Sequence, residues 1–594
     1  MARIIRSPSS LALSIALIVF AAAAVGQELP KERFAITDVR VFDGTGIIEQ
    51  TTVLVNGGTI AAVGSELPIP EGTPVIEGAG KTLLPGLIDC HTHTWGSALT
   101  QALTFGVTTS IDMFTQPDYA AGVYAKQAEN GNPGEADLYS AGILATAPGG
   151  HGTQYGFEIP TLTQPEDADA FVADRLAEGS KFIKIVHEDG SGWGRSIPTL
   201  DLPTVEAVVT ATHAREHLAV AHIGTLDSAE KIIPTGVDGL VHLFTDRPPS
   251  DRLIEAAGEA GIFVIPTLAV LAQNGTPVLE DANLSPFLES DQVQGLKRSF
   301  AGATPQEKLK NAFDTIRRLH EASVPILAGT DAPNPGTAHG ASMHHELALL
   351  VAAGLTPAEA LAGATAHAAE AFRLLDRGRI APGRRADLLL VEGNPLANIA
   401  ATRDIVGVWK LGVPAARQEV AATETRLPPL AATTISTFDT GDGDEIPSAF
   451  GFGWQPTTDE MAGGASQVNL VLVEAGDGKA LQVTGEILTG FAFPWAGAMF
   501  FPADQPMQPA NLSHRAGIRF RTQGDGGTYR LMVFAQSRGA MPAQATFEAG
   551  DGWQTEEHTF ESFGVDGSDL VGIAFTGGPG LGTFRFEIDD VTFY

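Results

Sequence analysis

The chain has 594 residues, too many for one hydrophobic core, so we expect two or more domains. Apolar residues make up 44% of the sequence and charged residues 18%, which excludes a disordered chain. The formal net charge of −33 argues against binding to nucleic acid or anionic lipid, whose phosphates would repel the protein.

The N-terminus, residues 1–26, has the pattern of a secretory signal peptide. Arg3 and Arg6 precede the apolar run LALSIALIVFAAAAV, which ends in small residues. This run is shorter than the ~20 residues that a membrane-spanning helix needs, which disfavours the alternative of an uncleaved anchor. We therefore expect a periplasmic or secreted protein without stable membrane insertion. The single cysteine, Cys90, excludes an intrachain disulfide and a cysteine-based zinc site.

Two separated segments have the sequence pattern of β-hairpins, in which apolar residues alternate with polar ones between glycines. The first covers residues 33–84 and the second residues 376–425. We expect them to join in one composite β-sandwich domain.

Between them, residues 85–375 carry eight compact apolar runs that alternate with helical patterns. The runs are LLPGLIDC, GVTTSIDM, LYSAGILAT, KFIKIV, LAVAHI, GLVHLF, IFVIPTL and VPILAGTD. Eight such units predict an α/β fold, a parallel (β/α)8 TIM barrel. The alternative is an open doubly wound sheet, which ranks lower because no glycine-rich dinucleotide loop follows the first strand.

The remaining chain is β-like and rich in glycine. LPPLAATT, residues 427–434, is a plausible linker, and residues 435–594 predict a C-terminal β-sandwich of jelly-roll type. Trp495, Tyr529 and Trp553 would either stack on a glycan or peptide or fill the core of this sandwich.

Metal-binding residue types recur where the barrel strands end. The first strand ends at His91 and His93, which face the same way because strand side chains have period two. His222, His242 and Asp331 end or follow later strands. Since the carboxyl ends of barrel strands share one mouth, this pattern predicts a divalent metal site there.

Lys184 lies inside the apolar run FIKIV. A buried lysine is costly unless it is paired or chemically changed. Its amine could take up CO2 to form a carbamate that bridges two metal ions, or it could form an ion pair with an acidic neighbour.

These motifs resemble the amidohydrolase superfamily over about residues 33–420. The resemblance is carried by PGLIDCHTH, the strand-four lysine, the histidines of strands five and six, GTD, and the return segment RGRIAPGRRADLLLVEGNP. It is nearest to the imidazolonepropionase-like and prolidase-like group. The C-terminal region resembles complex I intermediate-associated proteins and carbohydrate-binding jelly rolls.

The resemblance implies a site with two divalent ions, with zinc as the expected metal, although Mn, Co and Fe also suit such ligands. His91, His93 and Asp331 would hold one ion, His222 and His242 the other, and carboxylated Lys184 would bridge them.

Other residues receive roles from the same resemblance. Asp331 would also move a proton to the leaving nitrogen, and His151 would steady the substrate carbonyl. Tyr155 is a further candidate for substrate contact. His213, His217, His344 and His345 are expected on helices, as solvated or packing residues.

The expected function is exported, metal-dependent hydrolysis of an amide-type C–N bond in a small molecule such as a dipeptide or N-acyl amino acid. One alternative is a lactone or ester hydrolase at the same metals. Another is a binding protein with an inactive barrel and a glycan-docking C-terminal module. HIGT follows the strand-five histidine where prolidase-like enzymes often have alanine and an aromatic residue, so their substrate preference does not transfer directly. The oligomeric state stays open.

Overall fold

The computed structural model describes residues 33–154, 158–194, 196–300, 304–420, 427–440, 446–459, 464–476, 478–489, 494–536 and 542–594. The expected signal peptide and Tyr155 lie outside the described residues. Within these ranges, no helix has both the length and the apolar character needed to cross a membrane.

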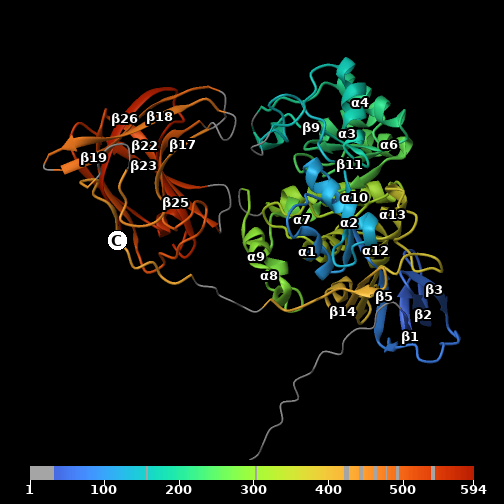
Figure 1. Ribbon diagram of the computed structural model, residues 1–594. Helices are drawn as coiled ribbons and strands as arrows, with labels where there is room; N and C mark the ends of the chain where they lie inside the picture. Colours follow the sequence, from blue (N-terminus) through green and yellow to red (C-terminus); the bar gives the residue numbers. More distant parts are fainter. Residues whose placement is uncertain are drawn as a thin grey trace, which may run out of the picture.

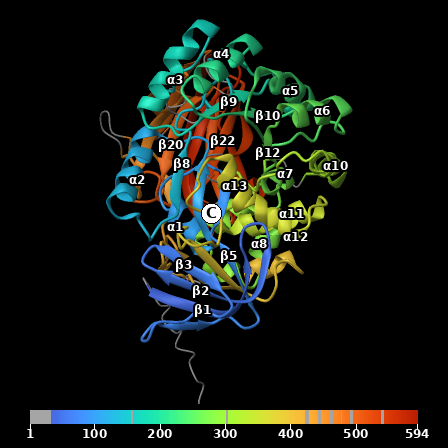
Figure 2. The ribbon, with the colours of Figure 1, turned by 90° about the vertical axis from the view of Figure 1, so that its right-hand side faces the viewer.

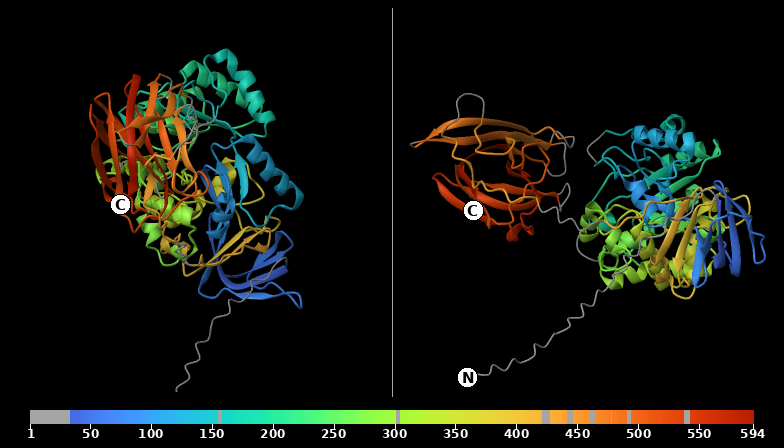
Figure 3. Two further views of the ribbon diagram at one scale, coloured as in Figure 1. Left: turned by 60° about the vertical axis from the view of Figure 1, so that its left-hand side comes forward. Right: turned by 60° about the horizontal axis from the view of Figure 1, so that its bottom comes forward.

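Strands from before and after the barrel form one eight-stranded sheet, in the order β15-β14-β13-β5-β1-β2-β3, with β4 paired to β1. Figures 1 and 3 show the blue N-terminal strands beside the yellow-orange ones that follow the barrel. Phe34 and Trp409 stack in its core, with ring centroids 5.4 Å apart. The strands are β1 (Arg33–Phe42), β2 (Ile47–Asn56), β3 (Thr59–Gly64), β4 (Val75–Glu77), β5 (Lys81–Pro85), β13 (Leu388–Glu392), β14 (Ile405–Lys410) and β15 (Val413–Pro414).

The barrel confirms the expected fold class. Its named strands are β6 (Leu87–Thr92), β7 (Val107–Asp112), β8 (Asp137–Ser140), β9 (Ile183–His187), β10 (Ala219–Ile223), β11 (Gly239–Val241) and β12 (Phe263–Ile265). The pairs β6-β7-β8 and β9-β10-β11-β12 are parallel, and a bridge between Ala145 and Ile185 joins the two groups. The eighth run closes the ring through the bridges Val264–Ile326 and Thr92–Ala332.

The run LLPGLIDC, predicted as one strand, is divided between the two sheets. β5 pairs with β13 in the small sheet, whereas β6 pairs with β7 in the barrel. The break falls at Gly86, where an added Cβ would lie 2.3 Å from Thr108 Oγ1. Only glycine allows the chain to pass this close to the neighbouring strand.

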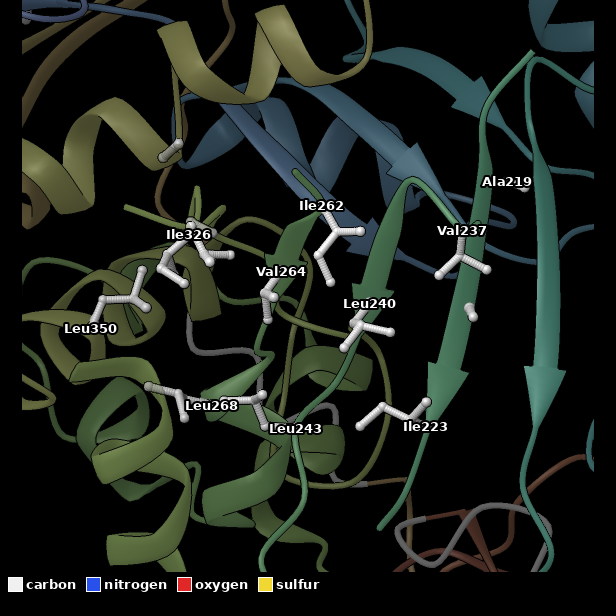
Figure 4. Packing of buried hydrophobic residues seen from close by; sticks show 14 of the residues in the cluster. Ala219, Ile223, Val237, Leu240, Leu243, Ile262, Val264, Leu268, Ile326 and Leu350 are labelled. Atoms are coloured by element: carbon white, nitrogen blue, oxygen red, sulfur yellow. The ribbon is translucent and has the colours of Figure 1, made fainter. Parts of the chain in front are cut away.

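Side chains of the barrel strands alternate between the helices and the lumen. Leu240 and Val264 pack outward against the helical layer, as Figure 4 shows, while Val241 and Ile265 belong to the lumen cluster. Phe372 packs on Phe182 and Phe263 in this lumen cluster, at 5.5 Å between ring centroids in each pair. The barrel lumen is therefore filled by packed aromatic side chains beneath the strand ends.

The helices surround the strands, and Figure 2 shows α4, α5 and α6 outside β9 and β10. Side-chain caps start several of them: Asp201 accepts a hydrogen bond from Thr204 N, and Ser250 from Leu253 N. The segment after β12 forms α8 and α9, which pack around Phe105. The helices are α1 (Ala98–Thr104), α2 (Pro117–Asn130), α3 (Ala168–Ala177), α4 (Leu202–His213), α5 (Leu226–Ile232), α6 (Asp251–Ala260), α7 (Leu268–Ala272), α8 (Thr276–Leu279), α9 (Ser290–Lys297), α10 (Gln306–Glu321), α11 (Ala341–Ala352), α12 (Pro357–Gly363) and α13 (Ala366–Ala371).

The small sheet is tied to the barrel by a buried charge cluster around Asp137, at the start of β8. Lys410 Nζ lies 2.5 Å from Asp137 Oδ1, and Arg377 and Arg385 each lie 2.7 Å from Oδ2. Lys410 is fully buried and also donates to the carbonyl oxygens of Asn132 and Glu135. Its charge is therefore compensated by one carboxylate and two backbone carbonyl oxygens.

The C-terminal region is an all-β sandwich, drawn in orange and red in Figures 1 and 3. One sheet has the order β18-β19-β26-β21-β24, with β16 on β26, and the other β17-β20-β25-β22-β23. Residues 427–434, expected as a linker, are held to this sandwich through hydrogen bonds with Asn511. The strands are β16 (Thr434–Ser436), β17 (Gly453–Thr458), β18 (Gln467–Ala475), β19 (Gly478–Ile487), β20 (Ala496–Phe501), β21 (Gly517–Gly524), β22 (Gly527–Ala535), β23 (Ala543–Ala549), β24 (Gln554–Thr559), β25 (Leu570–Gly577) and β26 (Gly582–Phe593).

Tyr529 fills the core of this sandwich, 3% exposed, so it is not available to stack on a ligand. Trp495 is half-buried and donates to Thr457, and the Trp553 ring is covered by Arg521.

The four histidines expected on helices divide into two groups. His344 and His345 are buried in α11, where His344 hydrogen-bonds Thr402 and the carbonyl oxygen of Phe105. His213 ends α4, but His217 lies beyond it, so the helical prediction for His217 is wrong because the chain turns after His213.

Candidate metal centre

Six side chains with metal-ligating chemistry come from different barrel strands to one place. His91 and His93 come from the end of β6, Lys184 from β9 and His222 from β10. His242 follows β11 directly, and Asp331 ends the eighth run. Apart from Lys184, which is the second residue of β9, these side chains lie at or just beyond the carboxyl ends of parallel strands, as the sequence predicts.

Asp331 is the centre of this group. Its Oδ1 lies 3.2 Å from Nε2 of His91 and 2.9 Å from Nε2 of His93, and its Oδ2 lies 3.9 Å from Nδ1 of His242. Ligand atoms of His91, His242 and Asp331 all lie within 4.8 Å of one another, close enough to share one cation. The tightest triad thus includes His242 in place of His93.

The histidine rings form a continuous row across the mouth. The centroid distance is 4.6 Å from His91 to His242, 4.6 Å from His242 to His222 and 5.1 Å from His222 to His151. His151 comes from the loop after the third strand. It is distant in sequence from His222 and His242, and the tertiary structure brings it beside them. The row extends beyond the triad of His91, His242 and Asp331 to His222 and His151.

Left-handed backbone conformations redirect the side chains at the strand ends. His242 has φ 68°, Thr267 φ 50° and Asp331 φ 58°. Such values are uncommon for residues other than glycine and concentrate at functional sites. Because Val241 faces the lumen, regular alternation would turn His242 toward the helices, and its positive φ turns it into the mouth instead.

Buried carboxylates below the histidines hold the strand ends in register. Asp89 accepts hydrogen bonds from the backbone N of His91 at 3.2 Å and from Oγ1 of Thr330 at 2.6 Å, joining the first and last strands. Asp112 accepts from the backbone N and the hydroxyl of Thr94, just after His93. These contacts orient the ligands and touch none of the reacting atoms.

A second chain of contacts fixes His242. Its Nδ1 lies 2.7 Å from Oγ1 of Thr267, which leaves Nε2 for a ligand. Thr267 precedes α7, whose first N–H groups, those of Leu268 and Ala269, donate to the buried carboxylate of Glu346.

Burial lowers the pKa of His91, His151, His222 and His242, whereas at His93 the contact with Asp331 outweighs burial and raises the pKa. Burial lowers the pKa of His91, His222 and His151 to about 3, with Lys184 or a neighbouring histidine adding to the effect. Burial raises the pKa of Asp331, but His91, His93 and His242 outweigh it and hold the pKa well below the usual range. Neutral imidazole and ionised carboxylate are the forms that bind metals.

Lys184 is 3% exposed and forms no ion pair within 4.0 Å in the part of the chain that the structure describes. The ion-pair alternative is therefore not what the structure contains. Burial lowers the pKa of Lys184 to about 7, partly offset by Asp331. A large neutral fraction of an amine is the condition for its reaction with CO2.

The side chains present fit a divalent metal. Nδ1 of His91 and Nε2 of His222 are buried without a hydrogen-bond partner among the described residues, and Nε2 of His91 has only Oδ1 of Asp331 beside it, at 3.2 Å. Buried polar atoms are seldom left unpaired, because each costs about 1–3 kcal/mol. A cation among these donors would satisfy all of them.

Sequence reasoning missed three residues at this mouth. Glu188 lies directly after β9 and faces His222, and Thr267 holds His242. His339, before α11, is buried with Nδ1 unpaired among the described residues. The sequence signal for Glu188 was a carboxylate four residues after Lys184, visible only as one acidic residue in a loop.

Comparison with known proteins gives two family matches. Residues 82–415 match the amidohydrolase family, and residues 445–566 match the complex I intermediate-associated protein 30 (CIA30) family.

Individual relatives cover the barrel and the small sheet. The imidazolonepropionase of Cereibacter sphaeroides is 29% identical, with 62% of this chain and 93% of that protein covered. A Bifidobacterium longum protein assigned as a prolidase is 26% identical, covering 66% of this chain and 96% of that structure with a TM-score of 0.52. A Xaa-Pro dipeptidase with bound methionine shares the fold at 21% identity and a TM-score of 0.51, covering 64% of this chain and 99% of that one. With a matching family over more than half of its length and the His/His/Asp site in place, the chain belongs to the amidohydrolase family.

Proposed function

We propose that the protein is an exported, metal-dependent hydrolase that cleaves an amide-type C–N bond of a small molecule, such as a dipeptide or an N-acyl amino acid. The observation that carries the proposal is the convergence of His91, His242 and Asp331 at the barrel mouth, with buried donor atoms left unpaired among the described residues. Membership in the amidohydrolase family supports hydrolysis of C–N bonds. The likeness to an imidazolonepropionase and an assigned prolidase supports a small substrate.

Two divalent ions are proposed for the site, with zinc as the first choice because imidazole and carboxylate ligands suit it. His91, His93 and Asp331 would hold one ion and His222 and His242 the other. Lys184, carboxylated, would supply the anionic bridge. When bound, such ions make water a nucleophile at neutral pH and polarise the substrate carbonyl.

The chain's own residues supply orientation and proton transfer. Asp331, which lies between His91 and His93, would take a proton from the attacking water and pass it to the leaving nitrogen. His151, whose ring centroid is 5.1 Å from that of His222, would hold the substrate carbonyl oxygen as negative charge develops. The packed apolar cluster around Phe372 would close the lumen below the site to water.

Export is proposed from the N-terminal sequence, in which two arginines precede a short apolar run with an alanine-rich end. Cell fractionation and N-terminal sequencing of the mature protein test it. A cytoplasmic protein that keeps residues 1–26 would contradict it.

The function is tested by measuring metal content and turnover on one preparation. Dipeptides, N-acyl amino acids and lactones are offered in parallel, and hydrolysis of an amide substrate that stops on chelation is the expected result. Turnover of lactones alone would establish ester chemistry at the same site. Bound metal with no turnover of any class would contradict the proposal.

A further inference from the structure

Glu188 has an unusual environment for a carboxylate. It lies directly after β9 at the barrel mouth and is 2% exposed. Its Oε1 accepts a hydrogen bond from Gly190 N at 2.7 Å. Its Oε2 is buried and has no hydrogen-bond partner in the described part of the chain.

The unpaired oxygen faces an unpaired nitrogen. Oε2 of Glu188 lies 3.6 Å from Nε2 of His222, which is also buried without a hydrogen-bond partner among the described residues. This distance is too long for a hydrogen bond. Two donor atoms bound to one ion at about 2.1 Å in a tetrahedral arrangement are about 3.4 Å apart. The spacing therefore suits two ligands of one cation better than a hydrogen bond between Glu188 and His222.

The absence of a side chain at Gly224 leaves space for the Glu188 carboxylate. A Cβ at Gly224 would lie 1.9 Å from Oε2 of Glu188, closer than any side chain allows. Gly224 is the third residue of HIGT, the stretch that departs from the alanine–aromatic pattern expected after the strand-five histidine. The glycine at position 224, where the sequence departs from that pattern, is therefore what allows the Glu188 carboxylate to lie beside His222.

The charges around Glu188 do not neutralise it. No lysine or arginine lies within 4.0 Å of its carboxylate in the described residues, and the neighbouring His187 is turned to Ser228 at 2.7 Å. His151 also lies on this side, with its ring centroid 5.1 Å from that of His222, and the adjacent Asp189 adds a further negative charge. Burying an unpaired carboxylate is expensive, so a cation supplied from outside the chain is the consistent partner.

We propose that Glu188 is a direct ligand of the divalent cation held by His222. The proposal rests on the proposed function, because it assumes that His222 binds a metal. Glu188 would add an anionic oxygen to the ligands of this ion, which are otherwise His222, His242 and carboxylated Lys184. Oxygen donors favour harder ions, so this position would accept Mn²⁺ or Zn²⁺ and discriminate against soft ions.

The test is Co²⁺ binding to the full chain, followed by equilibrium dialysis and by the visible absorption of the bound ion. Glu188→Gln keeps the size of the side chain and removes its charge. We expect the weaker of two Co²⁺ sites to lose at least tenfold in affinity, with an altered absorption spectrum, while the tighter site is unchanged. Gly224→Ala leaves every charge in place and displaces the carboxylate, so it should weaken the same site.

Asp189→Asn is the matched control. Asp189 is the adjacent carboxylate, but it is exposed and its Oδ1 accepts hydrogen bonds from Ser191, so its loss should leave both Co²⁺ affinities at the wild-type value. Thermal melts of the variants, measured without metal, exclude unfolding as the cause of weaker binding.

Three results would overturn the proposal. If Glu188→Gln binds two Co²⁺ ions with wild-type affinity and spectrum, Glu188 is not a ligand, and the proposed function still stands. If it raises only the KM for substrates with a free ammonium group, the carboxylate recognises substrate instead. If the wild-type chain binds no Co²⁺, the proposed function fails together with this inference.

Discussion

The hydroxyl of Thr267 lies 2.7 Å from Nδ1 of His242, although the two residues come from the ends of different strands. Both adopt left-handed backbone conformations, which bring their side chains together in the barrel mouth. The contact engages Nδ1 of His242 and leaves Nε2 available to a metal ion. A contact of this kind fixes the tautomer and the direction of a metal-binding histidine.

Thr267→Val removes the hydroxyl but keeps the branched shape. We expect metal affinity to fall about 10- to 100-fold, the usual effect of losing a hydrogen bond to a ligand. Thr267→Ser, which keeps the oxygen, should stay near wild type. Competition with a chromophoric chelator measures both. Equal affinity in all three proteins would show that Thr267 does not orient His242.

The purified protein should hold about two divalent ions per chain, because the unpaired donors extend from His91 to His222. Elemental analysis of active protein measures this content, and removal of the ions should abolish turnover. One ion per chain would leave only the triad around Asp331 as a site. Active protein with far less than one ion would exclude metal dependence.

Lys184→Ala should lose metal and activity together, with partial rescue by a small carboxylic acid that fills the vacated space. Lys184→Arg should not be rescued, because its guanidinium stays charged and cannot take up CO2. Mass measurement of the metal-loaded protein under bicarbonate checks the adduct directly. Full activity in Lys184→Ala would exclude the bridging role.

Asp137→Asn should destabilise the fold by about 3–5 kcal/mol at pH 7, since it leaves Lys410 buried without its partner. Burial raises the pKa of Asp137, but Lys410, Arg385 and Arg377 outweigh it and lower the pKa below its usual value. The carboxylate therefore stabilises the fold above its unfolded pKa of about 3.9, and this contribution is lost as pH falls through the lower folded pKa.

Urea unfolding at several pH values from about 2 to about 7, across the titration range of carboxyl groups, measures this effect. The difference between wild type and Asp137→Asn should shrink in acid. Asp169→Asn is the control: its ion pair with Arg215 is exposed to solvent, so its removal should change the free energy of unfolding little at any pH. A pH-independent difference would mean that packing, and not charge, is responsible.

A chain ending near residue 425 should keep metal and hydrolysis of small substrates, because every proposed ligand precedes that point. The C-terminal sandwich has a separate hydrophobic core, which supports independent folding. Steady-state kinetics of the shortened and full chains make the comparison. A folded, metal-loaded but inactive short chain would place part of the active site in the sandwich.

Sequence patterns predicted the barrel because each strand is a short apolar run and the polar ligands end these runs. His91, His93, His222 and Asp331 could be placed at one mouth for the same reason. The division of the first run at Gly86 could not be predicted, because it depends on contact with Thr108 from the next strand.

The contacts that complete the site were also beyond sequence reasoning. The bond between Thr267 and His242 depends on two left-handed residues, which no hydrophobic pattern indicates. The place of Glu188 depends on a missing side chain at Gly224, two residues after a histidine in a different strand. Such pairs are set by tertiary approach and become visible only in the folded chain.

The pairing of β5 with β13 has a consequence for how the protein is made. Leu84 lies opposite Leu389, so the two strands meet only after the whole barrel between them has been synthesised. Until then the early hairpin strands present an apolar face and an open edge to their surroundings. We expect nascent chains to depend on a holding chaperone during this interval, and the last step of folding to be the joining of this seam.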